Sequence, residues 1–255
     1  MELTVIGSGT VAPSADRTAP AHWVSAGPVR LLLDCGAGTL HRAATFGIAW
    51  ETVTHVAVTH FHPDHWGELP MLLFALRWGT EPRREAPLHL VGPVGLRDRL
   101  EHLAAAYGLW VTAPDFPLDI DEIRPGDTRS LAAGVLLDCC KTPHTDESLA
   151  YGVRHGGAHL VYTGDTGESE ELAAWASDCD LLLCECSLPD ARAIALHLTP
   201  TQAGALARAA RAHRLVLTHF YPVFGETDPV AVASREYSGE VVAAHDGDHF
   251  TIEGR

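Results

Sequence analysis

A histidine-rich hexapeptide that directly follows an apolar segment is the feature that most constrains this chain. Three imidazoles and one carboxylate fall within His60-Phe61-His62-Pro63-Asp64-His65. The preceding segment, His55-Val56-Ala57-Val58-Thr59, has the alternating apolar pattern of a buried strand. The histidines therefore lie where a core strand ends and a loop begins. At such a position a rigid scaffold sets the directions of metal ligands.

The spacing of these side chains favours two cations. From an extended backbone, His60 and His62 can point at one metal, while Asp64 and His65 follow on the turn and can reach a second. Imidazole nitrogen and carboxylate oxygen suit Zn²⁺, and less exclusively iron or manganese. Isolated histidines carry little weight in a chain with 16 of them among 255 residues, so the prediction depends on the spacing.

The composition is that of an ordinary globular protein, 46% hydrophobic, and its length suits a single domain over residues 1–255. The formal net charge of -15 disfavours extended binding to nucleic acid, which requires a basic face. The six cysteines show no CxxC pair and no disulfide-framework spacing. Because a signal peptide and a membrane-length apolar run are also missing, we expect a soluble, cytoplasmic protein with free thiols.

Strands and helices are predicted to alternate along the chain. Besides the strand before the hexapeptide, apolar runs predict strands over 3–6, 29–33, 88–91, 116–120, 134–140, 181–184 and 214–218. A long polar loop is expected between the first two. A hairpin over 149–163 should place His155 and His159 at the surface, and Asp246-Gly247 should turn a final hairpin. Helices are predicted over 67–78, from Pro93 to 107, from a capping box at 199–202 to about 213, and from Asp228-Pro229.

A carboxylate, Asp34, ends the predicted strand over 29–33 and precedes a glycine-rich turn. Two interpretations remain open for it. Asp34 could accept the free ring N–H of a metal-bound histidine, or it could cap the next helix. A phosphate cradle in the turn is a weaker alternative, because neither GK[ST] nor a dinucleotide-binding fingerprint is present.

A short internal similarity, called the echo below, indicates where the remaining ligands lie. The segment Val58-Thr59-His60-Phe61 in the first half resembles Leu217-Thr218-His219-Phe220 in the second. Each half of the chain therefore places a histidine at the end of an apolar strand. This favours two similar β-rich halves that face each other, with ligands at the seam. His144 and Asp165 also follow predicted strands, and a carboxylate between two metal sites is a common bridge.

Taken in order, His60-x-His62-x-Asp64-His65, His144, Asp165 and His219 resemble the metallo-β-lactamase superfamily of hydrolases. Three further motifs are similar to its phosphodiesterase branch, typified by ribonuclease Z, the tRNA 3′ processing enzyme: Gly7-Ser8-Gly9-Thr10 with Pro13 and Arg17, Asp34-Cys35-Gly36-x-Gly38-Thr39, and His197-x-Thr199-x-x-Gln202-Ala203. The resemblance covers essentially the whole chain. It implies an α/β (α+β) fold, a four-layer αββα sandwich of two mixed β-sheets flanked by helices.

The resemblance also implies a dinuclear centre with two Zn²⁺ ions, Mn²⁺ or Fe²⁺ being alternatives. One metal would be held by His60, His62 and His144, the other by Asp64, His65 and His219, with Asp165 as the bridge. The implied catalytic residues are Asp64, His197 and Glu185. A metal-bridging hydroxide would attack phosphorus in line, and His197, held by Glu185, would stabilise charge or protonate the leaving oxygen. A loop histidine without a role is the alternative for His197.

Three departures from that branch shape the expected substrate. Only 20 residues separate His144 from Asp165, where long-arm enzymes insert a tRNA-gripping arm. The segment 220–224 lacks the serine and arginine expected to hold phosphate, and Gly167 stands where a basic residue is common. We therefore expect a small phosphodiester, such as a cyclic nucleotide, or a short RNA 3′ end. The alternatives are a lactone, thioester or sulfate-ester hydrolase on the same centre, and a metal-binding sensor without turnover. A homodimer is left open.

Overall fold

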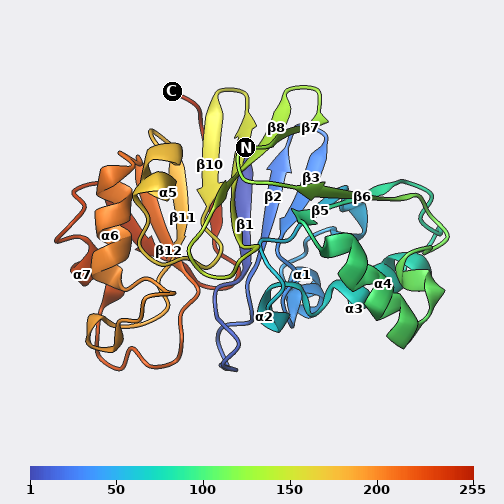
Figure 1. Cartoon of the computed structure of the whole chain (residues 1–255), viewed down its shortest axis with the longest axis horizontal. Helices are drawn as coiled ribbons and strands as arrows, with labels where there is room; N and C mark the ends of the chain where they lie inside the picture. The colour runs from blue at the N-terminus through green and yellow to red at the C-terminus, as the bar shows by residue number, and fades with distance from the viewer.

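The structure, a computed structural model that describes residues 1–255, consists of two seven-stranded β-sheets packed face to face between helices (Figure 1). The first sheet contains, in spatial order, β14 (His249–Thr251), β1 (Glu2–Gly7), β2 (Ala21–Ala26), β3 (Val29–Leu33), β4 (His55–Ala57), β5 (Leu88–Pro93) and β6 (Leu118–Ile123). The second contains β13 (Glu240–Ala243), β12 (Arg214–Thr218), β11 (Leu181–Glu185), β10 (Ala158–Tyr162), β9 (Leu149–His155), β8 (Val135–Lys141) and β7 (Thr128–Ala132).

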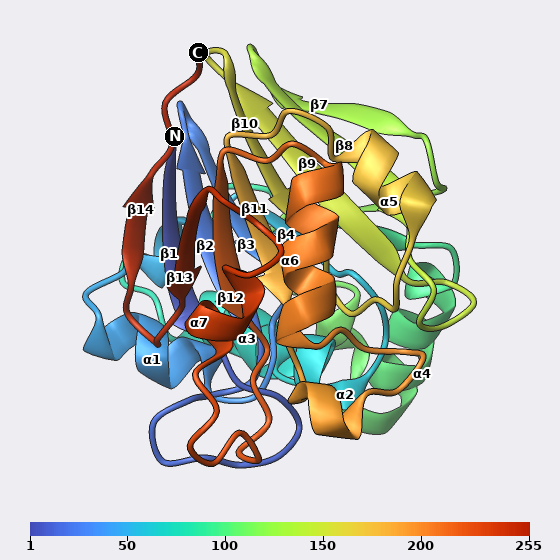
Figure 2. The same ribbon diagram turned by 90° about the vertical axis from the view of Figure 1, so that its left-hand side faces the viewer.

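Helices cover the outer face of each sheet. The first sheet packs against α1 (Thr39–Thr45), α3 (Leu69–Trp78) and α4 (Leu96–Tyr107), while the short α2 (Pro63–Trp66) follows β4. On the second sheet, α6 (Pro200–Ala209) lies lengthwise between α5 (Glu170–Trp175) and α7 (Pro229–Ala233) (Figure 2). Three single turns complete the chain, η1 (Trp50–Thr52), η2 (Leu109–Val111) and η3 (Asp190–Arg192). None of the helices has the length and hydrophobicity needed to span a membrane.

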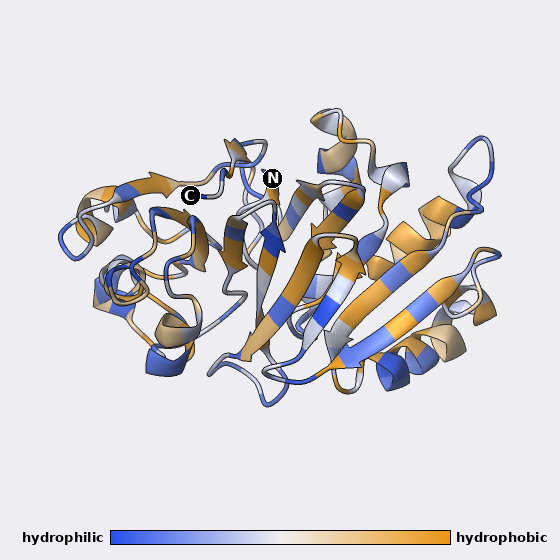
Figure 3. Ribbon diagram, turned by 90° about the horizontal axis from the view of Figure 1, so that it is seen from above, coloured by the Kyte–Doolittle hydropathy of each residue, from blue (hydrophilic) through white to orange (hydrophobic).

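Because side chains alternate along a strand, each central strand contributes to two apolar layers. On β3, Leu31 and Leu33 point into the 25-residue cluster between the sheets, whereas Leu32 packs against the helices. On β11, Leu181 and Leu182 divide in the same way. Strands buried on both faces are largely apolar, and Figure 3 shows orange stretches along the strands, interrupted by blue segments.

Both sheets are mixed. β3 to β6 run parallel in the first, β10 to β13 run parallel in the second, and the remaining neighbours are antiparallel. The ends of β4, β8, β10, β11 and β12 therefore open at one edge of the sandwich, where polar side chains can gather. The αββα fold class predicted from the sequence is confirmed, and so are the two facing halves inferred from the echo.

Two strands escaped prediction. The expected long loop contains β2, which is buried almost throughout, although its larger apolar residues, Trp23 and Val24, are adjacent in sequence and show no alternation. At the sheet edge, β7 is half-exposed and polar, so it lacks the apolar alternation that marks an inner strand. The expected final hairpin is also wrong, because β13 pairs with β12 and β14 pairs with β1. The connection between them crosses from one sheet to the other, and Asp246 on it accepts hydrogen bonds from the backbone N–H groups of Ser8 (2.9 Å) and Thr18 (2.8 Å).

Several predicted boundaries shift. Pro93 ends β5 and does not open α4, which begins three residues later at Leu96. The strand expected over 116–120 lies at 118–123, and α6 ends at Ala209. His159 is buried, contrary to the expected surface position, because β10 is covered on both faces.

Candidate metal centre

All seven side chains predicted as metal ligands converge at the edge where the parallel strands end. Four of the seven follow the ends of strands: His60 follows β4, His144 follows β8, Asp165 follows β10 and His219 follows β12. The others come from the hexapeptide, whose second half forms α2 and does not remain a loop as expected. The cluster is mostly buried; His62 is exposed at its mouth and His144 is partly exposed.

One group of donor atoms surrounds His62. Its Nδ1 lies 3.0 Å from His60 Nε2 and 3.1 Å from His144 Nε2. Asp165 Oδ2 completes the group, at 3.8 Å from His60 Nε2 and 3.5 Å from His144 Nε2. These four donor atoms lie close enough together to surround a single cation.

A second group lies on the other side of Asp165. The Nε2 atoms of His65 and His219 are 3.3 Å apart, and Asp64 Oδ2 lies 4.0 Å and 3.7 Å from them. Asp165 Oδ1 is 3.2 Å from each of the two imidazole nitrogens. The Asp165 carboxylate thus presents one oxygen to each group.

The residues fit a pair of cations. Ligands held about 2.0–2.2 Å from a shared Zn²⁺ lie roughly 3.0–3.5 Å from one another, which matches the spacing of the imidazole nitrogens. Asp165 Oδ1 is buried without a hydrogen-bond partner, an arrangement that is costly unless a cation or proton compensates it. Burial alone would raise the pKa of Asp165, but His219 and His65 outweigh it and hold the pKa well below its usual range.

Asp34 orients one of these imidazoles. Its Oδ2 accepts hydrogen bonds from His65 Nδ1 (2.7 Å) and the Tyr162 hydroxyl (2.8 Å), and its Oδ1 accepts from the Thr59 N–H (2.7 Å). A bond to Nδ1 leaves His65 Nε2 free to face the centre. The interpretation of Asp34 as a histidine acceptor is confirmed, and the helix-cap alternative is wrong, because Gly38 occupies the N-cap of α1.

The glycine-rich turn after Asp34 does not form a phosphate cradle. The Glu68 carboxylate accepts hydrogen bonds from the backbone N–H groups of Gly38, Thr39 (3.1 Å) and Leu40 (3.0 Å). A carboxylate therefore already occupies the amino end of α1, where a phosphate group would otherwise bind.

His197 and Glu185 form a pair beside the second group. Glu185, buried at the end of β11, accepts from His197 Nδ1 (2.9 Å) and from the backbone N–H groups of Thr166 (2.7 Å) and Leu198 (3.1 Å). Burial alone would lower the pKa of His197, but the hydrogen bond and charge of Glu185 outweigh it, so this pKa is raised. The predicted capping box at Thr199 is present and anchors the segment that follows His197.

Sequence reasoning missed Ser187. Its Oγ lies 2.8 Å from His219 Nδ1 and 3.2 Å from His197 Nδ1, and it donates to Glu185 Oε2 at 2.5 Å. The hydroxyl therefore connects a candidate metal ligand to the candidate acid. A lone serine two residues beyond a strand-end glutamate gives no spacing signal, so only the structure reveals this role.

The structure explains the glycine at position 167. A Cβ built on Gly167 would lie 2.0 Å from the Ala195 carbonyl oxygen, and the Gly167 N–H donates to the Pro143 carbonyl at 3.1 Å. The segment that leads to His197 packs directly on this backbone. A basic side chain at this position would have to displace that segment.

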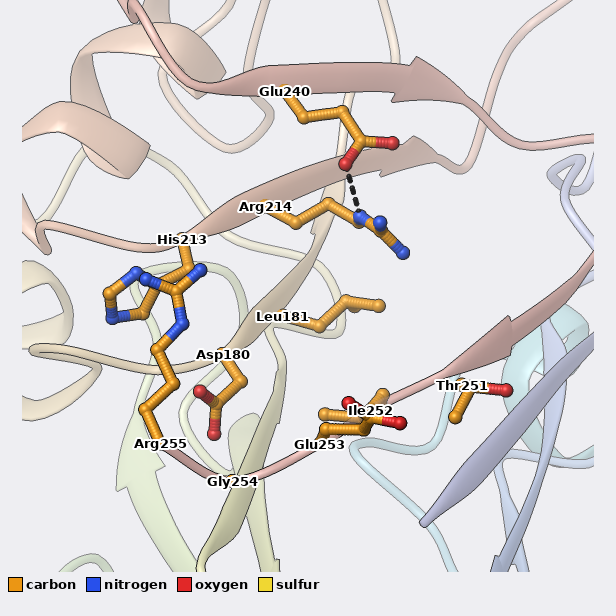
Figure 4. Close-up of a pocket in the computed structure, with 10 residues that line it drawn as sticks. All are labelled: Asp180, Leu181, His213, Arg214, Glu240, Thr251, Ile252, Glu253, Gly254 and Arg255. Carbon is orange, nitrogen blue, oxygen red and sulfur yellow. Dashed lines mark hydrogen bonds and ion pairs between the residues drawn. The ribbon is translucent and has the colours of Figure 1, made fainter.

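A second, polar cleft lies away from this centre. It has a volume of about 340 Å³ and is lined by residues before β11 and β12 and by the end of the chain (Figure 4). Within it, Arg214 forms an ion pair with Glu240 at 2.7 Å. The cleft adjoins the amino ends of strands whose carboxyl ends carry Glu185 and His219, so it contributes nothing to the cluster.

Comparison with known proteins places the chain in a family. A model described as a β-lactamase superfamily domain matches residues 29–220. Ribonuclease Z of Mycobacterium bovis (strain BCG / Pasteur 1173P2) is 29% identical over 272 residues, which cover 96% of each chain. Ribonuclease Z of Mycobacterium sp. (strain KMS) is 30% identical over 244 residues, which cover 87% of this chain and 85% of that protein.

Solved structures of related proteins support the same family assignment. The metallo-β-lactamase fold protein YhfI of Bacillus subtilis superposes with a TM-score of 0.84 at 25% identity, over 98% of both chains. The short form of human tRNase Z superposes with a TM-score of 0.82 at 25% identity, over 99% of this chain and 100% of that one. The resemblance drawn from the sequence motifs is confirmed. The chain belongs to the β-lactamase superfamily and, within it, to the ribonuclease Z family of metal-dependent phosphodiesterases.

Proposed function

We propose that this protein hydrolyses small or terminal phosphodiesters with two zinc ions bound in the groups around Asp165. His60, His62 and His144 would hold one ion, Asp64, His65 and His219 the other, and Asp165 would bridge them. The observation that carries this proposal is the position of the Asp165 carboxylate, whose two oxygens face different groups of buried imidazole nitrogens.

The protein's own contribution is to orient the ligands and exclude water. Asp34 binds His65 Nδ1 and Ser187 binds His219 Nδ1, so both rings are fixed with Nε2 toward the centre. When bound, the two cations would lower the pKa of a shared water toward neutrality and offset the negative charge of the phosphoryl oxygens.

His197 is the proposed acid for the leaving oxygen. Its Nδ1 donates to Glu185, which leaves Nε2 as the atom that can carry a transferable proton. The Glu185 carboxylate accepts from three further groups, so its direction is fixed by the surrounding backbone and by Ser187. The raised pKa of His197 favours the protonated form that this role requires.

The proposed substrate is an RNA 3′ end or a small cyclic phosphodiester. The names of the relatives, ribonuclease Z and tRNase Z, support an RNA end. The net charge of -15 argues against a grip along many phosphates. Arg17 lines a cleft that also contains Asp64, but it is half-buried and its Nη1 is already engaged by Ser8 Oγ and the Ala244 carbonyl. Gly167 contributes no cation.

Turnover of four phosphodiesters by zinc- and manganese-loaded protein tests the proposal. The panel is bis(p-nitrophenyl) phosphate, a 2′,3′-cyclic nucleotide, cyclic AMP and an unprocessed tRNA, with His62→Ala as the inactive control. Cleavage of the small diesters alone supports a small-substrate enzyme, and accurate tRNA cutting supports the RNA end. No turnover of any of the four would refute phosphodiester hydrolysis. It would favour the alternative that the protein hydrolyses lactones or thioesters.

A further inference from the structure

The chain contains 17 arginines but only one lysine, Lys141. It is the last residue of β8 and precedes His144 by three positions. Wherever else this chain places a basic side chain, it uses a guanidinium group. The single exception lies beside the proposed metal centre. An ammonium group at this position can make contacts that a guanidinium group cannot.

The Lys141 ammonium group is enclosed by oxygen atoms of the loop that it begins. Nζ lies 2.5 Å from the carbonyl oxygens of both Thr142 and Thr145. The carbonyl oxygen and Oγ of Ser148 lie at 3.4 Å and 3.3 Å. Three protons on a compact, roughly tetrahedral head can serve such a converging set, whereas a planar guanidinium fork cannot. Burial lowers the pKa of Lys141, as expected for a head that faces the protein.

The loop is also held by Ser148, whose buried Oγ lies 3.0 Å from the carbonyl oxygens of Thr142 and Thr145 and accepts from the Thr145 N–H at 3.0 Å. Residues 142–148 read Thr-Pro-His-Thr-Asp-Glu-Ser and contribute no side chain to the apolar clusters. Three of its carbonyl oxygens converge on one point, where their partial negative charges repel one another. The Ser148 hydroxyl supplies only one proton to these oxygens, whereas the ammonium group supplies three protons and a positive charge, so it contributes to the loop conformation.

The same contacts lead to the proposed metal ligands. The Thr142 carbonyl that meets Nζ also accepts the backbone N–H of His144 at 2.9 Å. Thr142 Oγ1 donates to the Asp165 carbonyl at 2.9 Å. His144 Nδ1 lies 3.0 Å from the Leu196 carbonyl, so its Nε2 is directed toward His62. Movement of the Thr142 carbonyl would therefore shift His144 relative to Asp165.

We propose that Lys141 is a positioning residue whose ammonium group takes the place of a bound monovalent cation and holds the loop that presents His144. This inference rests on the metal assignment proposed above. It adds that the group containing His144 depends on Lys141, while the group of Asp64, His65 and His219 does not.

Zinc titration against a chelator, without substrate, tests this dependence in the wild type, in Lys141→Met and in Arg124→Met. The control removes an exposed cation whose guanidinium forms no hydrogen bond. We expect two zinc ions per chain in the wild type and the control. In Lys141→Met one ion should bind about 10–100-fold more weakly and the other should be retained, as is usual when a group that orients a metal ligand is lost. The visible absorption of Co²⁺-loaded protein should change for one site only.

Two further variants separate charge from packing. Lys141→Arg keeps the charge but should not restore the weakened site, because its planar fork does not fit the oxygens. In Lys141→Ala, added ammonium or potassium ions should restore zinc binding at the weakened site. Two tight zinc ions in Lys141→Met would overturn the inference, as would full occupancy in Lys141→Arg. So would equal weakening of both sites together with a fall in the stability of the metal-free protein. A wild type that binds no zinc would instead overturn the proposed function.

Discussion

Replacement of His197 by alanine is the sharpest test of the proposed chemistry. The His197 ring lies beside the candidate metal ligands, and its Nδ1 is held by Glu185 at 2.9 Å. If Nε2 donates a proton to the leaving oxygen, the loss should depend on how much that oxygen needs the proton. An alkoxide leaving group needs it strongly, whereas p-nitrophenolate departs without it.

The expected loss for an alkoxide leaving group is about 10²–10⁴-fold in kcat, the usual contribution of a general acid. This corresponds to about 3–5 kcal/mol of activation free energy. For bis(p-nitrophenyl) phosphate the loss should be less than about tenfold, because little proton transfer occurs in the transition state. Glu185→Gln should show the same pattern, because an amide can hydrogen-bond the wrong tautomer of the ring.

The assay measures kcat for a dinucleotide and for bis(p-nitrophenyl) phosphate, together with zinc content by metal analysis. His102→Ala, which removes an exposed histidine of α4, is the matched control and should leave both values unchanged. An equal loss for both substrates would refute the acid role. A drop in bound zinc would also refute the acid role, because it would show that His197 acts as a metal ligand. The His197 ring lies within reach of Asp165 and His219, so such a role is sterically available.

Four further substitutions test the centre and its surroundings. His62→Ala and Asp165→Ala should both lower metal content and abolish turnover, and full zinc in either would contradict the ligand assignment. Asp34→Ala should destabilise the metal-free protein by about 1–3 kcal/mol in urea unfolding, since it leaves buried donors unpaired. It should also weaken zinc binding about 10–100-fold in a chelator competition. Gly167→Arg should lower kcat through displacement of the segment at Ala195, and improved RNA cleavage by this variant would contradict the steric account.

Much of the candidate site was predictable because its determinants are local. His60 and His62 belong to one hexapeptide after an apolar strand, and Asp165 and His219 each follow a strand of their own. Parallel strands end at one edge, so residues that are distant in sequence but placed alike converge. The capping box at Thr199 was likewise complete within four residues.

The errors arose where a segment takes its structure from its neighbours. β2 and β7 lack an apolar alternation of their own and are strands because an adjacent strand pairs with them. The apparent final hairpin failed because a turn sequence such as Asp246-Gly247 does not specify whether the strands on either side pair with each other. Here they belong to different sheets.

By itself, the sequence determined the family, because its motifs are residue types at short spacing, and the fold class followed from that resemblance. Only the tertiary structure decided how the ligands are oriented. Asp34 reaches His65, Ser187 links His219 to His197, and Lys141 closes its loop through side-chain contacts. Such contacts depend on where distant backbones approach within hydrogen-bonding range, and no short pattern of residues encodes that distance.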